Sequence, residues 1–236
     1  MKRINYLFLT ATMLSFAACS NDEGTNNDNN LVEARITASA SRAIDNQWEA
    51  DAIAVTVASS PVSSMKDMYK NVKYTTTSTG TTAEFVAEQN KSIYFQDADE
   101  TVTFTAYGPY NDPNSEGDIL FSTENQNTAE TRKAVDFIYA SGVRASKSSP
   151  TVNFMFKHIM SRLVLKVTAG NGISASDITS GQYFLNGIEL NGKFNANTGA
   201  AQAITSSANQ NQQQYSLNDK VQITPNEADK RTFTVI

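Results

Sequence analysis

Hydrophobic and polar residues alternate along this chain with a period of two, in short runs separated by turn residues. The clearest run covers residues 31–40. Because successive side chains of a strand point to opposite faces, this run predicts a strand with one buried face and one solvated face. The buried face is expected to carry Val32, Ala34, Ile36, Ala38 and Ala40.

Similar runs recur along the body of the chain, whereas no window from 31 to 236 carries a sustained apolar period of 3.6 residues. The further predicted strands cover 53–58, 73–77, 82–87, 102–107, 152–156, 161–167, 183–190, 192–195 and 232–236. One short helix is expected, near 63–69 or 128–132. Clusters of Gly, Pro, Asn and Ser between the runs favour an all-β protein built as a sandwich with Greek-key connections.

A stretch rich in Gly, Ser, Asn and Thr, residues 169–181, interrupts the strand pattern and predicts a domain boundary. We therefore expect an N-terminal β-sandwich over 31–168 and the start of a second β domain over 169–236. This second part contains a low-complexity polar patch at 210–214. Because the sequence stops within the apolar pattern of 232–236, we expect the second domain to be incomplete here.

The first 18 residues are organised as a secretory signal peptide. Lys2 and Arg3 give a positive start, residues 6–16 are apolar, and small residues follow at 17–18. The segment is too short to span a membrane stably. Residues 19–30 are polar and without apolar periodicity, which predicts a flexible tether between the signal peptide and the body.

The single cysteine, Cys19, excludes an internal disulfide and every zinc pattern with several cysteines. It directly follows Phe16-Ala17-Ala18, which resembles the lipobox of bacterial lipoproteins, although Leu is more usual at the position of Phe16. The resemblance implies cleavage before Cys19 and its lipidation; an ordinary signal peptide with a chance cysteine is the alternative. The acidic pair at 22–23 resembles the surface-export signal of Bacteroidota lipoproteins, or is a solvating linker.

Composition narrows the classes of function. Hydrophobic residues make up 40% of the chain and aromatic residues 9%, which is typical of a folded protein rather than a disordered one. The net charge is −5, and the nineteen Lys and Arg residues form no run. Because binding to phosphates requires clustered positive charge, nucleic acid is excluded as a partner.

Catalytic and metal sites are not predicted. The single histidine, His158, would have to serve any Ser/His/Asp triad, and no G-x-S-x-G elbow accompanies it, so we interpret it as structural. Residues 112–119 match the opening of a calcium loop, but Thr123 stands where the bidentate Glu belongs, which favours a surface turn. No cofactor is expected, because neither a phosphate-binding glycine loop nor a nucleotide fingerprint is present.

Two further groups of residues are candidates for carbohydrate sites. Asp97, Asp99 and Glu100 are interpreted as loop charges, because the sequence cannot place two carboxylates at the separation that glycoside hydrolysis requires. Trp48, Tyr107 and Tyr110 could stack on sugar rings, but aromatic residues at strand ends more often belong to the core or its rim.

Several local patterns together resemble the Mfa-like fimbrillin family of Bacteroidota. Their order along the chain matches as well. They are the lipobox at Cys19, the Ser-Arg-Ala at 41–43, W-x-x-D-x-I at 48–53, A-Y-x-P-Y at 106–110, D-x-x-Y-A at 136–140 and F-x-H-x-x-S-x-L at 156–163. Ala52 departs from the Gly that the family often has before the Ile. Residues 183–199 look like the opening of the family's second sandwich.

The resemblance implies tandem transthyretin-like domains in a lipoprotein that is assembled into fimbriae or carried at their tip or base, without enzymatic activity. It also implies that a trypsin-like protease cuts after an Arg near the N-terminus, for which Arg42-Ala43 is the matching position. Such a cut would remove the lipid together with strand 31–40 and open a groove for a strand of another subunit.

The implied partners are other fimbrial subunits, the lipoprotein export machinery and the outer membrane, with a location on the cell surface. A surface glycan or protein of a host or bacterium is a further expected partner. A glycan-binding surface lipoprotein remains the alternative function, and a surface hydrolase is a more distant third.

Overall fold

The computed structural model describes residues 31–39, 48, 51–204, 219–223 and 232–236. All of them belong to one compact unit, Leu31–Ile236. Within this described part of the chain, no helix is long and apolar enough to cross a membrane. The predicted signal peptide, Cys19, the tether, Ala40, Arg42 and Ala43 lie outside the described residues.

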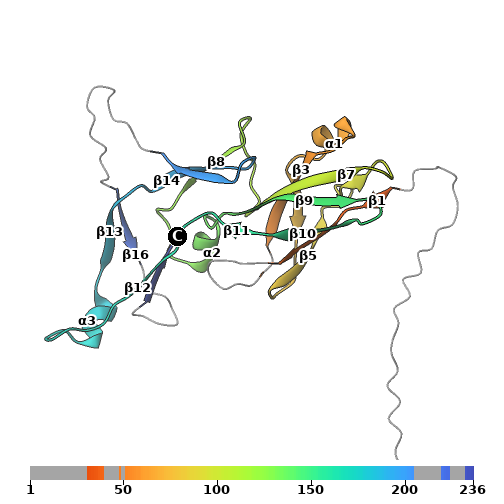
Figure 1. Ribbon diagram of the computed structural model, residues 1–236. Coiled ribbons are helices and arrows are strands. Elements are labelled where there is room, and N and C mark those ends of the chain that lie inside the picture. Colours follow the sequence, from red (N-terminus) through yellow and green to blue (C-terminus); the bar gives the residue numbers. More distant parts are fainter. Residues whose placement is uncertain (1–30, 40–47, 49–50, 205–218, 224–231) are drawn as a thin grey trace, which may run out of the picture. The chain divides into compact units, whose positions relative to one another are not determined.

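Strands dominate the described residues, and their order along the chain can be followed in Figure 1. The strands before residue 125 are β1 (Val32–Glu33), β2 (Arg35–Ser39), β3 (Ala52–Ser59), β4 (Val72–Thr75), β5 (Thr82–Ala87), β6 (Tyr94–Phe95), β7 (Thr101–Gly108) and β8 (Asp118–Ser122). The later strands are β9 (Ile138–Ser146), β10 (Thr151–Met155), β11 (Lys157–His158), β12 (Leu163–Lys166), β13 (Tyr183–Ile188), β14 (Asn191–Asn195), β15 (Ala200–Ala203), β16 (Asp219–Ile223) and β17 (Thr232–Val235). The short helices are α1 (Ser63–Met68), α2 (Ala129–Lys133) and α3 (Ala175–Ser180).

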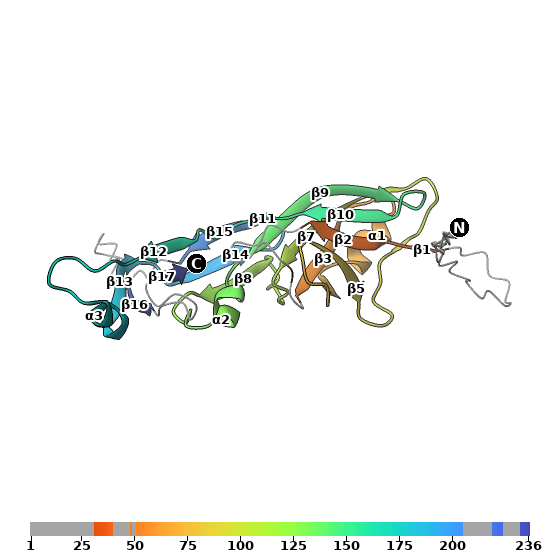
Figure 2. The same cartoon turned by 90° about the horizontal axis from the view of Figure 1, so that it is seen from below.

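The principal sheet has the strand order β10-β2-β5-β4-β3-β7-β9-β11. The order follows from the ladders of β4 and β5: β4 pairs with both β3 and β5, and β5 continues to β2. Side chains from β2, β5 and β10 share one buried cluster with side chains from β3, β7 and β9. These strands therefore enclose a common core between them, which is the arrangement of a β-sandwich (Figure 2).

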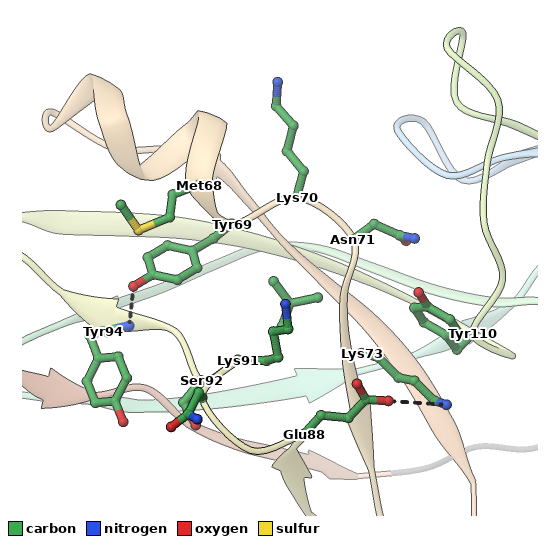
Figure 3. Close-up of a pocket in the computed structure, with 12 residues that line it drawn as sticks. Met68, Tyr69, Lys70, Asn71, Lys73, Glu88, Lys91, Ser92, Tyr94 and Tyr110 are labelled. Atoms are coloured by element: carbon green, nitrogen blue, oxygen red, sulfur yellow. Dashed lines mark hydrogen bonds and ion pairs between the residues drawn. The ribbon is translucent and has the colours of Figure 1, made fainter.

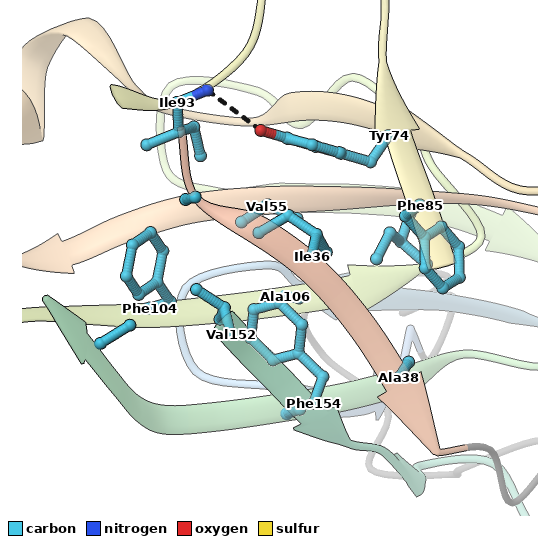
Figure 4. Close-up of a cluster of buried hydrophobic side chains, with 14 of the residues drawn as sticks. Ile36, Ala38, Val55, Tyr74, Phe85, Ile93, Phe104, Ala106, Val152 and Phe154 are labelled. Atoms are coloured by element: carbon cyan, nitrogen blue, oxygen red, sulfur yellow. Dashed lines mark hydrogen bonds between the residues drawn. The ribbon is translucent and has the colours of Figure 1, made fainter. Parts of the chain in front are cut away.

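The core confirms the predicted alternation of the first strand over 34–38, whereas Val32 is only half-buried. Ala34, Ile36 and Ala38 are each no more than 2% exposed, whereas Arg35 is exposed and Thr37 is half-buried. Figure 4 shows the apolar side chains of β2 among those of β5, β7 and β10. Burying an Ile side chain contributes about 2 to 3 kcal/mol to folding, so β2 helps to stabilise the sandwich.

A second group of strands is built around β14. It pairs with β15 on one side and with β8 on the other, so the segment predicted as the second domain shares a sheet with a strand from the first. Phe194 of β14 stacks on Phe137 with ring centroids 4.5 Å apart, and both rings are fully buried. Three further pairs, β1 with β6, β12 with β17 and β13 with β16, complete the described strands.

The structure adds elements that the alternation did not predict. Helix α3 lies inside the stretch 169–181, which the sequence marks only as a boundary, and a capping box between Ser174 and Asp177 starts it. Strand β9 was missed because Gly142, with φ of 75°, and a register shift interrupt its alternation. Strands β8, β15 and β16 were also missed, since each has five residues or fewer.

Candidate functional site

The strand predicted to be exchangeable occupies an interior position of the sheet. From Arg35 to Ser39 it runs parallel to β10, in a register of five residue pairs. Its other edge pairs antiparallel with β5 over four residue pairs, from Ile36 to Ser39. Strand β2 is therefore hydrogen-bonded on both sides, although it stands at the N-terminal end of the described chain.

The residues around β2 extend its attachment. The Ala34 N–H donates to the carbonyl of Ile93 at 2.8 Å, and the Arg35 N–H donates to the carbonyl of Pro150 at 2.9 Å. Just before them, β1 pairs with β6. The whole stretch 32–39 is thus joined to three other parts of the sandwich, through β5, β6 and β10.

The buried face of β2 has a small-large-small pattern. Ile36 is the one large side chain, and it stands between Ala34 and Ala38. Phe85 is the cross-strand partner of Ile36 on β5, and Phe154 is the partner of Ala38 on β10. The strand therefore fills one deep apolar position and two shallow ones, and its removal would expose aromatic rings to water.

The single histidine forms a pair with a buried acid. His158 Nδ1 lies 3.0 Å from Asp136 Oδ1, and Asp136 is only 1% exposed. His158 belongs to β11 and pairs there with Ile138 of β9. The pair links β11 to the segment before β9, which favours the structural role expected for this histidine.

The calcium-like run forms a turn whose oxygens are used by the protein itself. Asn114 Oδ1 accepts the N–H groups of Glu116 and Asp118. The carboxylate of Asp118 accepts from Lys193 Nζ at 2.8 Å and from Asn195 Nδ2 at 2.7 Å. These hydrogen bonds, that of Lys193 first, lower the pKa of Asp118, and Asp118 in turn raises the pKa of Lys193.

Metal ligands do not gather elsewhere in the described residues either: no group there brings together three or more His, Cys, Asp or Glu side chains that could hold an ion.

The acidic residues at 97–100 lie in two different environments. Asp97 accepts the N–H of Asp99 in an exposed loop, as expected. Glu100 is instead 2% exposed and accepts the N–H of Gln96 and the hydroxyl of Ser60, so it is not a solvated loop charge.

The three aromatic residues that could stack on sugar rings differ in their burial. Trp48 is fully buried and meets Phe85 edge to face at 5.1 Å between ring centroids. Tyr107 is 3% exposed and packs in the cluster around Phe194. Core positions therefore account for these two residues. Tyr110 is half-buried and lines a surface cleft.

The comparisons with known proteins agree with this architecture. A family model described as fimbrillin-like matches residues 41–236. The match covers most of the chain, so the protein belongs to the fimbrillin-like family.

The chain is also similar to a protein of Bacteroides uniformis named "Putative fimbrium subunit Fim1C", with 28% identity over 167 residues. The aligned part is 70% of this chain and 54% of that protein, so the chain spans about half the length of this curated relative.

Solved structures confirm the all-β fold. A "putative cell adhesion protein" of Bacteroides ovatus superposes with a TM-score of 0.67 at 23% identity, covering 87% of this chain and 77% of that one. A second "putative cell adhesion protein", from Bacteroides uniformis, superposes with a TM-score of 0.68 at 22% identity, covering 89% of this chain and 75% of that one. A fimbrial protein of Bacteroides ovatus superposes with a TM-score of 0.51 at 13% identity, covering 89% of this chain and 42% of that one.

Proposed function

We propose that this protein is a structural or accessory subunit of cell-surface fimbriae and that it assembles by exchange of strand β2. The observation that carries the proposal is the position of β2 between β10 and β5. An interior strand at the N-terminal end of a sandwich can be removed by a single cut in the chain. Among the described residues that precede this cut, only the two-residue β1 has to leave with it.

Loss of β2 leaves a site with a defined chemistry. The facing edges of β5 and β10 lose their backbone partners, and unpaired strand edges readily accept an added strand. Phe85 and Phe154 lose the cover of Ile36 and Ala38. A strand from another subunit restores both the hydrogen bonds and the apolar contacts, which is the physical driving force for assembly.

Maturation is expected to have two steps, lipidation first and cleavage second. Lipidation at Cys19 holds the exported protein at the outer membrane, since several acyl chains on one residue anchor a protein stably. A cut between Arg42 and Ala43 then frees the anchor and β2 together. The partners of the cut protein are other fimbrial subunits, and its location is the fimbrium on the cell surface.

The test compares wild type with Arg42→Ala in the intact exported protein. Wild type treated with a trypsin-like protease is expected to begin at Ala43 on N-terminal sequencing and to form oligomers with uncut partner subunits. Arg42→Ala is expected to remain an anchored monomer. Arg35→Ala is the matched control, because Arg35 lies within the paired strand and its replacement leaves the cut after Arg42 unchanged.

Two outcomes would contradict the proposal. One is cut wild-type protein that stays monomeric in the presence of intact partners. The other is Arg42→Ala protein that assembles like wild type. Either would show that β2 is not exchanged through cleavage at this position.

A further inference from the structure

A surface cleft that was not predicted from the sequence lies next to β6. Its volume is about 530 Å³, which is within the range of small-molecule sites. The walls come from the end of α1, the turn into β4, the β5–β6 loop, β6 and the loop after β7. Its lining includes three tyrosines and three lysines, namely Tyr69, Tyr94, Tyr110, Lys70, Lys73 and Lys91 (Figure 3).

Buried hydroxyl groups fix one wall of the cleft. The N–H of Tyr94 donates to Tyr69 Oη at 3.3 Å, and the N–H of Ile93 donates to Tyr74 Oη at 3.0 Å. Tyr69 and Tyr74 are both less than 10% exposed. The backbone that carries Tyr94 is therefore held at two successive residues by side chains of the core.

The turn before β4 is held in the same way. The N–H of Asn71 donates to Thr56 Oγ1 at 2.9 Å, and Asn71 Oδ1 accepts from the Tyr107 hydroxyl at 2.6 Å. Asn71 Nδ2 donates to the carbonyl of Asn111, near Tyr110. Asn71 adopts a φ of 52°, which few residues other than Gly and Asn tolerate. The cleft is thus preformed rather than a gap between mobile loops.

The charge of the cleft is opposite to that of the whole chain. Three lysines and one glutamate, Glu88, line it, whereas the protein carries a net charge of −5. Lys73 Nζ lies 3.6 Å from the Glu88 carboxylate and 5.3 Å from the centre of the Tyr110 ring. Figure 3 shows Lys91 between the Tyr69–Tyr94 side and the Lys73–Glu88 pair. Asp112 accepts the Tyr110 hydroxyl at the rim.

We propose that this cleft binds an acidic saccharide, a sugar unit that carries a carboxylate or a sulfate group. Lys91 and Lys73 offer cationic donors for the anionic group, and charge-assisted hydrogen bonds of this kind are the strong ones. The half-buried rings of Tyr94 and Tyr110 offer apolar surfaces to the C–H face of a sugar ring.

Glu88 favours a sugar over an acidic peptide. Its carboxylate accepts hydrogen bonds only, so it suits the hydroxyl donors that a saccharide carries beside its anionic group and that acidic side chains lack. The amides of Asn71 and Asn90 can serve as both donors and acceptors for the remaining hydroxyl groups. The site shares no lining residue with β2, but Tyr94 pairs with Glu33 of β1, which would leave together with β2, so binding is tested in the uncut protein.

The experiment uses the intact monomer and pairs of oligosaccharides that differ only in charge. The probes are sialyllactose, a chondroitin sulfate tetrasaccharide and a trigalacturonate, each beside its carboxyl-reduced or desulfated counterpart. Binding is followed by saturation-transfer NMR and by titration at low and at physiological salt. We expect at least one acidic probe to bind, with its uncharged counterpart about tenfold weaker or more, and weaker binding at higher salt.

Variants place the binding in the cleft. Lys91→Gln and Lys73→Gln are each expected to weaken the acidic probe about tenfold, and Tyr94→Leu to weaken charged and uncharged probes alike. Lys157→Gln is the matched control, because Lys157 is exposed on β11 and outside the cleft. Thermal melting of each variant shows that the fold is retained.

The proposal is overturned if no acidic probe binds, or if the uncharged counterparts bind equally well. Unchanged binding by Lys91→Gln and Lys73→Gln would overturn it too. An oligoglutamate peptide that displaces the saccharide at equal concentration would identify a protein-docking surface instead. None of these results bears on cleavage after Arg42, so the two proposals fail separately.

Discussion

Ile36 of β2 lies opposite Val152 of β10 in a parallel ladder, the one parallel pairing among the described strands. On its other side Ile36 faces Phe85 in an antiparallel ladder. A strand that replaces β2 therefore meets neighbours that run in opposite directions to each other, and it must satisfy both hydrogen-bond patterns at once. The side chain at the position of Ile36 must also fill the core.

The first prediction concerns that side chain. Ile36→Ala is expected to lower the free energy of unfolding by about 2 to 4 kcal/mol, because it leaves a cavity against Phe85 in a closely packed core. Urea unfolding of the uncleaved protein measures the loss. Arg35→Ala, on the exposed face of the same strand, is expected to change stability by no more than about 0.5 kcal/mol. Equal effects of the two variants would contradict the assigned faces.

The second prediction concerns Cys19. Cys19→Ser is expected to abolish acylation, so that the exported protein moves from the detergent phase to the aqueous phase. Intact-mass analysis of wild type is expected to show a lipidated Cys19 as the first residue. A mature N-terminus at another residue, or an unmodified Cys19, would contradict the lipoprotein assignment.

The third prediction concerns the His158–Asp136 pair. His158→Ala removes a partner of a carboxylate that is almost completely buried, which is expected to cost about 1 to 3 kcal/mol of stability. In the His158→Ala/Asp136→Asn double variant, the loss of stability is expected to be smaller than the sum of two independent losses. The reason is that the second substitution removes the buried charge that the first one left without this partner. Thermal melts of the single and double variants measure both effects. An unchanged melt of His158→Ala, together with a loss of ligand binding or turnover, would contradict the structural role.

The fourth prediction concerns high pH. Burial raises the pKa of Tyr74 to about 12, although the hydrogen bond from the Ile93 N–H opposes the shift. An unfolded tyrosine loses its proton near pH 10, so between about pH 10 and 12 the native state holds more protons than the unfolded state. Stability supplied by Tyr74 is therefore complete below about pH 10 and falls as the pH rises through this range.

Tyr74→Phe tests this dependence. Near neutral pH the variant is expected to be about 1 kcal/mol less stable than wild type, because it lacks the hydroxyl that accepts the Ile93 N–H. It should then lose less stability than wild type between pH 10 and 12. Urea unfolding at a series of pH values measures both slopes, and parallel slopes would refute the prediction.

The alternation of single strands was readable from the sequence because each strand has one buried face. The run 31–40 shows this most clearly, since from Val32 onward a polar residue follows each apolar one. One short helix was expected at 63–69 or 128–132, and the structure has a helix at both places. Helix α3 was also readable, because Ser174 followed by Asp177 is a capping signal, but the polar composition around it hid the signal.

Pairing between distant segments was not readable. The sequence gives no sign that β8 joins β14, because that ladder depends on how the whole chain folds. The cleft escaped prediction for the same reason. Tyr69, Lys91 and Tyr110 come from three separate segments, and each of them looks ordinary in its own surroundings. Glu100 was read as a solvated charge because its partners Gln96 and Ser60 are recognisable only in the fold.

The double pairing of β2 also has a mechanical meaning. A pull on the N-terminal end of β2 acts along the strand axis, so the hydrogen bonds to β5 and β10 are loaded in shear and resist together. If the hydrogen bonds were loaded one after another, as at the end of a sheet edge, they would instead break one at a time and at lower force. In a protein held at the membrane through its N-terminal end, this strand would carry the traction between the cell and the body, and release would require cutting the chain rather than stretching it.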